Sequence, residues 1–325
     1  MRNDIIVTTR AGIGDMLLCT PTLRAVKECH PQRRLIVYCV KRSHLEVLRH
    51  NPYVDSVRML PPLYLWRYPY HLYCYLFNKH WKRGHLFNPE KLKFYSLRYN
   101  HIPVSWLYDK SIKEIVPEIF ADLNVRLVEK NIQVFFTKKE EQNARKKLAP
   151  FKNVVIMHIF SRTSVNHHWP MDRWNELVRQ LPEYTFIQVG QSDEPQVAGA
   201  IDWRSDKMGI REMFCLLKYA TSFIGVDSCM AHATNAFNIP GVVLFGDTSP
   251  VHWGHDNNIN IYKGVRCAPC FHFANGDPCP YTHDCMDRIA VEEVKQALRC
   301  QVESRIGVQA GALSISTWGG KQLTE

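Results

Sequence analysis

The chain has 325 residues, of which 46% are hydrophobic, and its formal net charge is +10. This length exceeds one compact core of ordinary size and predicts two domains of about 150 residues each. No run of eighteen apolar residues and no signal peptide is visible, so we expect a cytoplasmic protein and not a membrane-spanning one.

The first predicted elements are a strand at 5–9, a glycine loop and a helix that begins near Asp15. Gly12 and Gly14 suit a tight turn, and apolar residues then recur near helical spacing. The helix dipole stabilises a carboxylate at this position and keeps it ionised near neutral pH. From these residues alone, Asp15 is either a helix cap or a catalytic base. Leu17 stands where a Gly-x-Gly-x-x-Gly fingerprint needs its third glycine, which disfavours a sugar-nucleotide dehydrogenase.

The segment 61–113 combines basic and aromatic residues. It holds nine Lys or Arg against two acids, and fourteen of the chain's thirty-seven aromatic residues. Such interleaving suits contact with an anionic surface, with Lys79, Lys82 and Arg83 as candidates to meet its phosphates or carboxylates. Two alternatives stay open: an insertion whose aromatic residues pack inward, and stacking on single-stranded nucleic acid.

Short apolar runs alternating with helical patterns predict buried strands and an α/β fold. The predicted strands are 5–9, 35–40, 154–159, 184–189, 223–226 and 242–245. The charged stretch 138–147 predicts a solvated helix before an interdomain junction near Pro150. We therefore expect domains at 1–150 and 151–303, followed by a tail at 304–325.

A strand, a polar turn and a short helix are predicted around Asp227. The apolar run ends at Asp227, and Ser228 is a good N-cap residue for a helix that begins near Cys229. The N–H groups of such a first turn favour an anion, and ligands of open α/β sheets bind at the carboxyl edge. The alternative is an ordinary strand–helix–strand unit with a capped helix.

Four cysteines lie within a loop rich in Gly, Pro and His. This spacing is the ligand pattern of a structural zinc or a single iron, with His272 and His283 as substitutes if one cysteine is not a ligand. The alternative is four reduced thiols. The four residues are Cys267, Cys270, Cys279 and Cys285.

Together these segments resemble glycosyltransferase family 9, the bacterial heptosyltransferases. The matching residues are Gly12-Ile13-Gly14-Asp15-Met16-Leu17-Leu18, His168-Trp169-Pro170 with Arg173-Trp174, and Asp227-Ser228 with Met230, His232 and Leu244-Phe245-Gly246. The resemblance implies a GT-B architecture, with two Rossmann-like domains facing across a cleft. It also implies an inverting transfer of heptose from ADP-heptose to a lipopolysaccharide inner-core or related glycan acceptor, with the acceptor bound by the first domain.

The resemblance assigns roles to residues of both domains. It implies that Asp15 is the general base, with Gly14 beside the acceptor. Backbone N–H groups at Ser228, Cys229 and Met230 would hold the departing diphosphate. Asp227 would brace the loop, and His232 would contact the donor or pack.

Two departures from the family pattern concern the diphosphate site. His167 stands where relatives commonly carry a lysine clamp, and a histidine holds an anion less well near neutral pH because its ordinary pKa is about 6.5. Arg162 can supply the cation, with Ser161 and Thr163 as hydroxyl donors. Cys229 stands where relatives often have glycine, which restricts how closely a phosphate approaches the backbone.

Alternatives to the favoured function remain at this point. A protein O-heptosyltransferase of the autotransporter type is favoured by the cysteine loop, because some such relatives bind iron there. A catalytically decayed nucleotide-sugar-binding or assembly protein is the alternative from another class. We expect no catalytic metal and no nucleic-acid partner. The expected partners are a nucleotide sugar and an anionic glycolipid or protein acceptor, with peripheral contact at the inner face of the cytoplasmic membrane.

Overall fold

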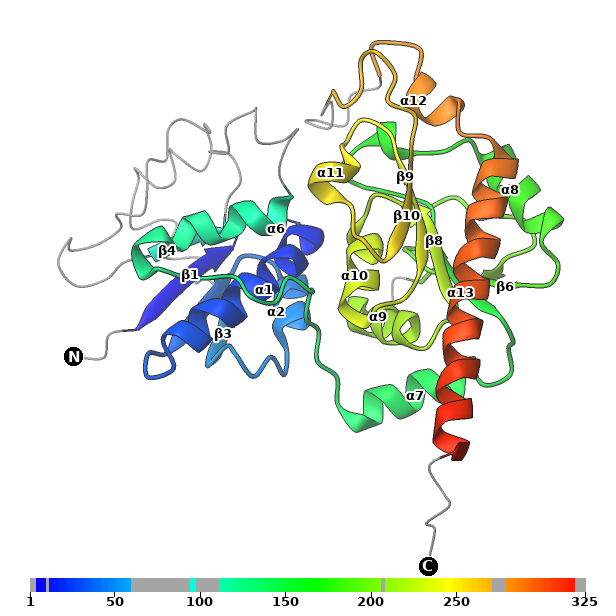
Figure 1. Cartoon of the computed structure of the whole chain (residues 1–325). Coiled ribbons are helices and arrows are strands. Elements are labelled where there is room, and N and C mark those ends of the chain that lie inside the picture. The colour runs from blue at the N-terminus through cyan, green and yellow to red at the C-terminus, as the bar shows by residue number, and fades with distance from the viewer. Residues whose placement is uncertain are drawn as a thin grey trace, which may run out of the picture. The chain divides into compact units, whose positions relative to one another are not determined.

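The structure is a computed structural model of the chain, and it describes residues 4–9, 12–59, 94–97, 111–205, 208–270 and 279–318. The chain divides into two compact units, Met1–Thr137 and Lys138–Glu325 (Figure 1).

The first unit is built on a parallel sheet of four strands in the order β3-β2-β1-β4. Helix α1 packs against α2, α6 and the short 3-10 helix η1. Its strands are β1 (Ile5–Thr9), β2 (Leu35–Cys39), β3 (Ser56–Met59) and β4 (Phe94–Leu97). Its helices are α1 (Ile13–Cys29), α2 (Arg42–Leu48), α6 (Ile112–Ile115) and η1 (Val116–Leu123).

The second unit contains a parallel sheet of six strands in the order β10-β9-β8-β5-β6-β7. The strands β5, β8 and β9 are buried along their whole length, which is typical of a parallel sheet covered on both faces. The six strands are β5 (Val154–His158), β6 (Thr185–Gln188), β7 (Ile201–Asp202), β8 (Ser222–Val226), β9 (Gly241–Phe245) and β10 (Asn258–Tyr262).

Helices cover both faces of this second sheet. Helix α13 packs on β8, β9, β10 and α8, whereas α10 packs on β8 and β9 from the other side together with α9 (Figure 1). The helices are α7 (Lys138–Leu148), η2 (Val165–His167), α8 (Met171–Gln180), α9 (Ile210–Lys218), α10 (Cys229–Phe237), α11 (Pro250–Trp253), α12 (Asp284–Asp287) and α13 (Val291–Trp318).

The division between the units precedes α7 and does not fall at Pro150, where the sequence analysis set it. Helix α7 packs on α9, and the guanidinium of Arg211 donates two hydrogen bonds to the carboxylate of Glu140 at 2.8 and 3.0 Å. Arg145 also lies over the ring of Tyr219. These contacts attach the charged helix to the second unit.

The core of the second unit includes the Trp-Pro segment that resembles the family. Trp169 and Trp174 meet edge to face at 4.8 Å, and the indole of Trp169 donates to the carbonyl of Ile289 at 3.0 Å. Arg173 donates to the same carbonyl at 2.7 Å. The segment therefore anchors the connection between α12 and α13.

The six strands predicted from the sequence are all present, with ends that differ by no more than one residue. Strands β3, β4, β7 and β10 were not predicted, because they are short or carry few apolar residues. Helix α13 continues through Trp318, where the sequence analysis expected a tail from residue 304.

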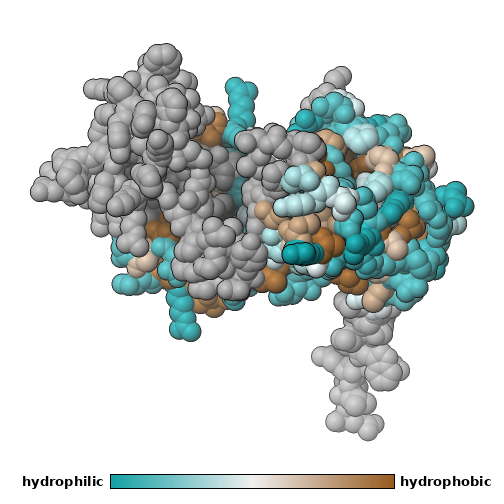
Figure 2. Space-filling view, turned by 90° about the horizontal axis from the view of Figure 1, so that it is seen from above, coloured by the Kyte–Doolittle hydropathy of each residue, from teal (hydrophilic) through white to brown (hydrophobic). Residues whose placement is uncertain are grey.

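Two surface properties follow from this fold. Of the helices that the structure describes, none combines the length and apolar character that crossing a membrane requires. In the space-filling view of Figure 2, hydrophilic residues cover most of the coloured surface of the second unit, with hydrophobic residues in small groups between them.

The strand order places a topological switch point between β5 and β8. From β5 the chain moves outward through β6 and β7, and it then returns to β8 on the other side of β5. Ligands of open α/β sheets bind beyond the carboxyl ends of the strands at such a point. The loops after β5, β6, β8 and β9 therefore define the region in which a site is expected.

Candidate functional site

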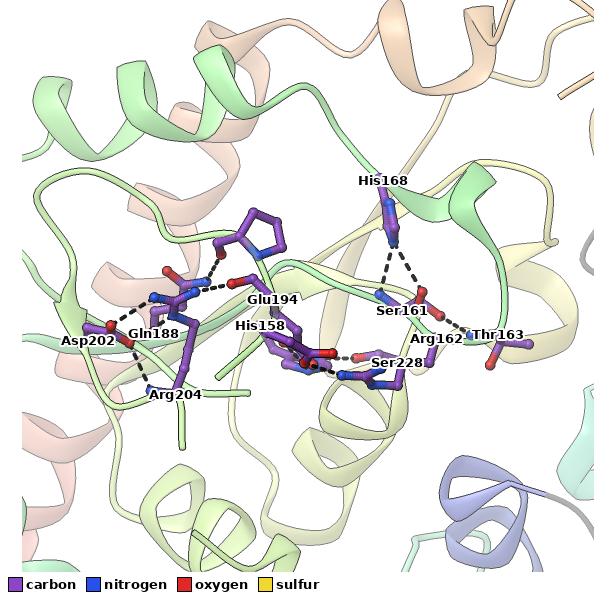
Figure 3. Close-up of polar contacts among 12 residues, drawn as sticks. His158, Ser161, Arg162, Thr163, His168, Gln188, Glu194, Asp202, Arg204 and Ser228 are labelled. Atoms are coloured by element: carbon purple, nitrogen blue, oxygen red, sulfur yellow. Dashed lines mark hydrogen bonds and ion pairs between the residues drawn. The ribbon is translucent and has the colours of Figure 1, made fainter. Parts of the chain in front are cut away.

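The N-terminus of α10 lies at this switch point. Strand β8 ends at Val226, and Ser228 occupies the N-cap position in extended backbone conformation. The Ser228 hydroxyl does not cap its own helix; among the described residues its oxygen lies 3.0 Å from Nδ1 of His158 (Figure 3). The first-turn N–H groups therefore keep the partial positive charge that favours an anion.

His158 ends β5 and lies in the interior. It pairs in register with Gly225 of β8, and its Nε2 lies 3.8 Å from Oε2 of Glu194. Burial lowers the pKa of His158 to about 4, so the ring is neutral near pH 7. A neutral imidazole at this position is a hydrogen-bonding group and not a cation for phosphate.

The first two residues of α10 present backbone rather than side-chain chemistry. Met230 is completely buried, and its side chain belongs to the core. Burial, followed by the nearby charge of Glu194, raises the pKa of the Cys229 thiol to about 12, so the thiol stays protonated. Any anion at this helix end therefore meets N–H groups beside a neutral sulfur.

Asp227 is bound within the loop that precedes α10. Its Oδ2 accepts a hydrogen bond from the hydroxyl of Thr248 at 2.7 Å, and its Oδ1 lies 3.8 Å from Nε2 of His232. His232 is buried in turn, with Nδ1 3.0 Å from Nε2 of His255. The Asp227 carboxylate thus links the loop after β8 to the loop after β9.

His167 is buried and engaged at both ring nitrogens. Nδ1 lies 3.1 Å from the carbonyl oxygen of Asp227, and Nε2 lies 2.7 Å from Oδ1 of Asp247. Burial lowers the pKa of His167, but the hydrogen bond with Asp247 and the charges of Asp227 and Asp247 outweigh it and leave the pKa above 6.5. Asp247 also accepts from Ser164 at 3.0 Å. In this structure the positive charge of His167 is paired with the carboxylate of Asp247.

The loop after β5 carries the remaining donor-side candidates. Ser161 is buried, and its hydroxyl accepts from the backbone N–H of Thr163 at 3.4 Å. Thr163 and Arg162 are exposed, and the Arg162 guanidinium pairs with the Asp193 carboxylate (Figure 3). His168 stacks on Phe160 with ring centroids 4.3 Å apart, which orients the loop. Arg162 is therefore the exposed cation of this loop, already paired with a carboxylate.

Asp15 lies in the first turn of α1 in the first unit. Its Oδ2 accepts a hydrogen bond from the backbone N–H of Gly12 at 2.6 Å, as in a capping box. Asp15 and Gly14 are both half-buried. This hydrogen bond fixes the orientation of the carboxylate at the start of α1.

The four cysteines of the loop, Cys267, Cys270, Cys279 and Cys285, are all reduced thiols in the structure. Cys285 is buried, and burial, with the charges of Asp247, Cys279 and Cys270, raises the pKa of its thiol to about 12. Cys267 is half-buried. Across the part of the chain that the structure describes, no group of three or more His, Cys, Asp or Glu side chains is arranged to hold a metal ion.

Three predicted acceptor residues, Lys79, Lys82 and Arg83, lie outside the described residues, as do most of segment 61–113 and His272. Among the polar residues of the site, sequence reasoning missed His158, Glu194, Asp247 and Thr248. His158 had a usable signal, because it is a polar residue at the end of a predicted buried strand. Glu194 had no such signal. It lies in the loop after β6, and only the order of the strands in the sheet brings this loop close to β5 and β8.

The family model for glycosyltransferase family 9 (heptosyltransferase) matches residues 116–278, about half of the chain. The chain belongs to this family. The matched region contains the donor-side loops described above and does not reach Gly12 to Asp15.

Three relatives illustrate the family likeness. Lipopolysaccharide heptosyltransferase 1 of Pseudomonas aeruginosa is 24% identical over 193 residues, which cover 56% of this chain and 52% of that protein. The chain thus aligns with about half the length of this curated relative. ADP-heptose lipopolysaccharide heptosyltransferase II of E. coli superposes with a TM-score of 0.64 at 15% identity, covering 93% of this chain and 99% of that one.

TibC, an iron-containing dodecameric glycosyltransferase from enterotoxigenic E. coli, superposes with a TM-score of 0.67 at 16% identity. The alignment covers 93% of this chain and 77% of TibC. These likenesses, with two units built on parallel sheets, confirm the expected α/β class and the GT-B fold of the family.

Proposed function

We propose that the chain is an inverting glycosyltransferase that moves heptose from ADP-heptose to a lipopolysaccharide inner-core or related glycan acceptor. The observation that carries the proposal is the N-terminus of α10 at the switch point of a sheet, in a chain of the heptosyltransferase family. The E. coli and Pseudomonas relatives act on ADP-heptose and on lipopolysaccharide by name, which supports this donor and acceptor class.

On the donor side, the N–H groups at Ser228, Cys229 and Met230 would bind the diphosphate as negative charge develops on it. Such donors act without reorganisation, and losing one typically costs 10²–10³-fold in kcat in other enzymes. Arg162 would add a cation after exchanging Asp193 for phosphate, because both side chains are exposed. The buried pair of His167 and Asp247 would hold the loops after β5 and β9 together.

On the acceptor side, Asp15 would take the proton of the attacking hydroxyl. The Gly12 N–H holds one carboxylate oxygen in place and so fixes the orientation of the carboxyl group at the start of α1. A base within hydrogen-bond reach contributes roughly 10²–10⁴-fold. Gly14 would allow close approach of the acceptor, and Lys79, Lys82 and Arg83 would bind its phosphates or carboxylates.

A ligand panel and a transfer assay test the proposal together. ADP at about 100 times its Kd should stabilise the fold by roughly 2.7 kcal/mol, and we expect a larger thermal shift with ADP-heptose than with UDP, GDP or CDP conjugates. Asp15→Asn should lose transfer and keep the ADP shift. A response to another base alone would discard heptose, and no response to any nucleotide would favour a decayed transferase or an assembly protein.

A protein O-heptosyltransferase is the second candidate, since TibC shares the fold and this chain carries four cysteines in one loop. The two candidates differ in the acceptor. Mass spectrometry of a Ser/Thr-rich autotransporter passenger and of a lipopolysaccharide-core oligosaccharide, each incubated with ADP-heptose, separates them. Modification of the protein alone would replace the favoured acceptor. For either acceptor we place the reaction in the cytoplasm, peripheral to the inner face of the membrane when the acceptor is a glycolipid.

We also propose that the cysteine loop binds a structural zinc or iron ion. Four thiols suit either metal in chemistry, and TibC is iron-containing, but the described side chains are not gathered around one point. No step of the mechanism therefore depends on a metal. Metal analysis of purified protein tests it: Cys267→Ser should lower the metal content, whereas Cys300→Ser, at an exposed cysteine outside the loop, should not. Absence of near-stoichiometric metal in the wild type would reject the site.

A further inference from the structure

Three side chains from three strand ends form a line at the switch point of the second sheet. Ser228 follows β8, His158 ends β5, and Glu194 lies in the loop after β6 (Figure 3). We propose that His158 is a positioning residue that directs the Ser228 hydroxyl toward a diphosphate, and that Glu194 determines which ring nitrogen carries the proton. This inference rests on the proposed function, because it explains how one donor of that site is oriented.

The direction of the Ser228 proton depends on the tautomer of His158. Oγ and Nδ1 are 3.0 Å apart, which is a hydrogen-bond distance. If Nδ1 accepts the hydroxyl proton, Ser228 can only accept from a ligand. If Nδ1–H donates to Oγ, the hydroxyl proton is free to be donated to a phosphate oxygen.

Glu194 faces the other ring nitrogen. Its Oε2 lies 3.8 Å from Nε2 of His158, and among the described residues this oxygen accepts no hydrogen bond although the side chain is 95% buried. An ionised carboxylate attracts the ring proton to Nε2 and leaves Ser228 as an acceptor. A protonated carboxyl loses this attraction and, once the 3.8 Å gap closes to hydrogen-bond distance, donates its own proton to Nε2, so that the ring proton lies on Nδ1 and Ser228 becomes a donor.

The surroundings of Glu194 favour its protonated form. Burial raises the pKa of Glu194, and the charge of Asp193 adds to this effect. A hydrogen bond that the Glu194 carboxyl accepts from the backbone N–H of Gln191, with the positive charges of Arg162 and Arg204, opposes it without reversing the direction. The thiol of Cys229 is protonated and adds no charge.

The backbone is shaped around these two side chains. Gly190 has φ +148°, and a Cβ there would lie 2.1 Å from Oε2 of Glu194. A Cβ on Gly225 would lie 2.3 Å from the carbonyl oxygen of His158. Arg204 donates to the backbone carbonyl of Glu194 and thereby holds its loop (Figure 3). The backbone at Gly190 therefore packs closely against the side chain of Glu194, and the backbone at Gly225 packs closely against the backbone of His158.

The line does not activate Ser228 as a nucleophile. With a pKa of about 4, His158 is a weak base near neutral pH and cannot carry a serine proton in a hydrolytic reaction. Orientation of a hydroxyl needs only a fixed tautomer, and a neutral buried ring provides it.

Ring 15N spectra of the ligand-free chain test the tautomer directly. The His158 signals are identified by their loss in His158→Asn. We expect the proton to shift from Nε2 to Nδ1 as the pH is lowered through the titration of Glu194, and to stay on Nδ1 throughout in Glu194→Gln, whose amide donates to Nε2. Tautomers that do not respond to pH or to Glu194→Gln would overturn the proposal.

ADP binding by calorimetry tests the consequence for the ligand. Ser228→Ala and His158→Gln should each weaken ADP by about tenfold at a pH at which the ring spectra place the proton on Nδ1, as expected for one hydrogen bond to a charged group, and the double variant should weaken it no further. The ratio of Kd between Ser228→Ala and wild type should fall toward one at a pH at which the spectra place the proton on Nε2, and reading this ratio cancels the titration of ADP itself. Additive losses would overturn the positioning role.

The two measurements separate the possible failures. A wild type that does not bind ADP refutes the proposed donor, while the ring spectra still decide whether Glu194 sets the tautomer of His158. Binding of ADP with an unresponsive ring refutes the positioning role and leaves the proposed function standing. His158→Asn serves as the matched control, because its amide takes the place of Nδ1 and can still donate to Ser228, so it should weaken ADP less than His158→Gln.

Discussion

Replacing Asp247 by Asn removes the negative charge from the buried pair with His167. The two side chains are 4% and 1% exposed, and the atoms Nε2 and Oδ1 are 2.7 Å apart. At an effective dielectric constant of about 20, two unit charges at this distance attract by about 6 kcal/mol. Desolvation offsets part of this attraction, and breaking one partner of a buried pair costs about 3–5 kcal/mol.

We expect the lower end of that range, about 3 kcal/mol, because the Asn side chain can still accept from Ser164 and His167 can release its proton. For a domain of 150–250 residues this corresponds to a fall in Tm of about 6–12 °C.

The loss should depend on pH in a defined direction. The folded pKa of His167 lies above 6.5, so its contribution to stability is complete below pH 6.5 and is lost as the pH rises through the folded value. Although burial acts to raise it, the folded pKa of Asp247 lies below 3.8, so its contribution is present above pH 3.8 and is lost as the pH falls through the folded value. Between these values both groups are charged, and Asp247→Asn should cost most there.

Urea unfolding followed by tryptophan fluorescence at pH 6 and pH 9 measures this difference. Asp193→Asn is the matched control, because its exposed pair with Arg162 should contribute at most about 1 kcal/mol. The reasoning fails if Asp247→Asn is no more destabilising than the control. It also fails if the cost is the same at both pH values.

Three further predictions concern other parts of the chain. Asp15→Asn should lower kcat for transfer by roughly 10²–10⁴-fold with little change in ADP affinity; loss of the fold itself would make the carboxylate only a helix cap. Gly225→Ala should destabilise the second unit by about 1–3 kcal/mol, measured by thermal unfolding, because its Cβ would meet the carbonyl oxygen of His158 at 2.3 Å, and an unchanged Tm would contradict the packing. Replacing Lys82 and Arg83 by Ser should raise the KM for an anionic acceptor with unchanged KM for the donor, and equal KM values would favour inward packing of the segment.

Much of the secondary structure was predictable, because buried parallel strands appear as short apolar runs. The strands around 154–159 and 223–226 are of this kind, and the observed β5 and β8 end within one residue of the prediction. The start of α10 was predictable from Ser228, a residue that commonly precedes a helix. The partner of its hydroxyl was not, because capping is a local interaction and the bond to His158 spans 70 residues.

The sequence by itself determined which residues form the buried strands, and which polar residues follow them, since these depend on local apolar spacing and on turn residues. It also carried the family resemblance, now shown by the match over 116–278. Only the tertiary structure decided that His158, Glu194 and Ser228 meet, and that His167 faces Asp247. The reason is that these contacts follow from the order in which parallel strands pair, and that order is a long-range choice that local spacing does not encode.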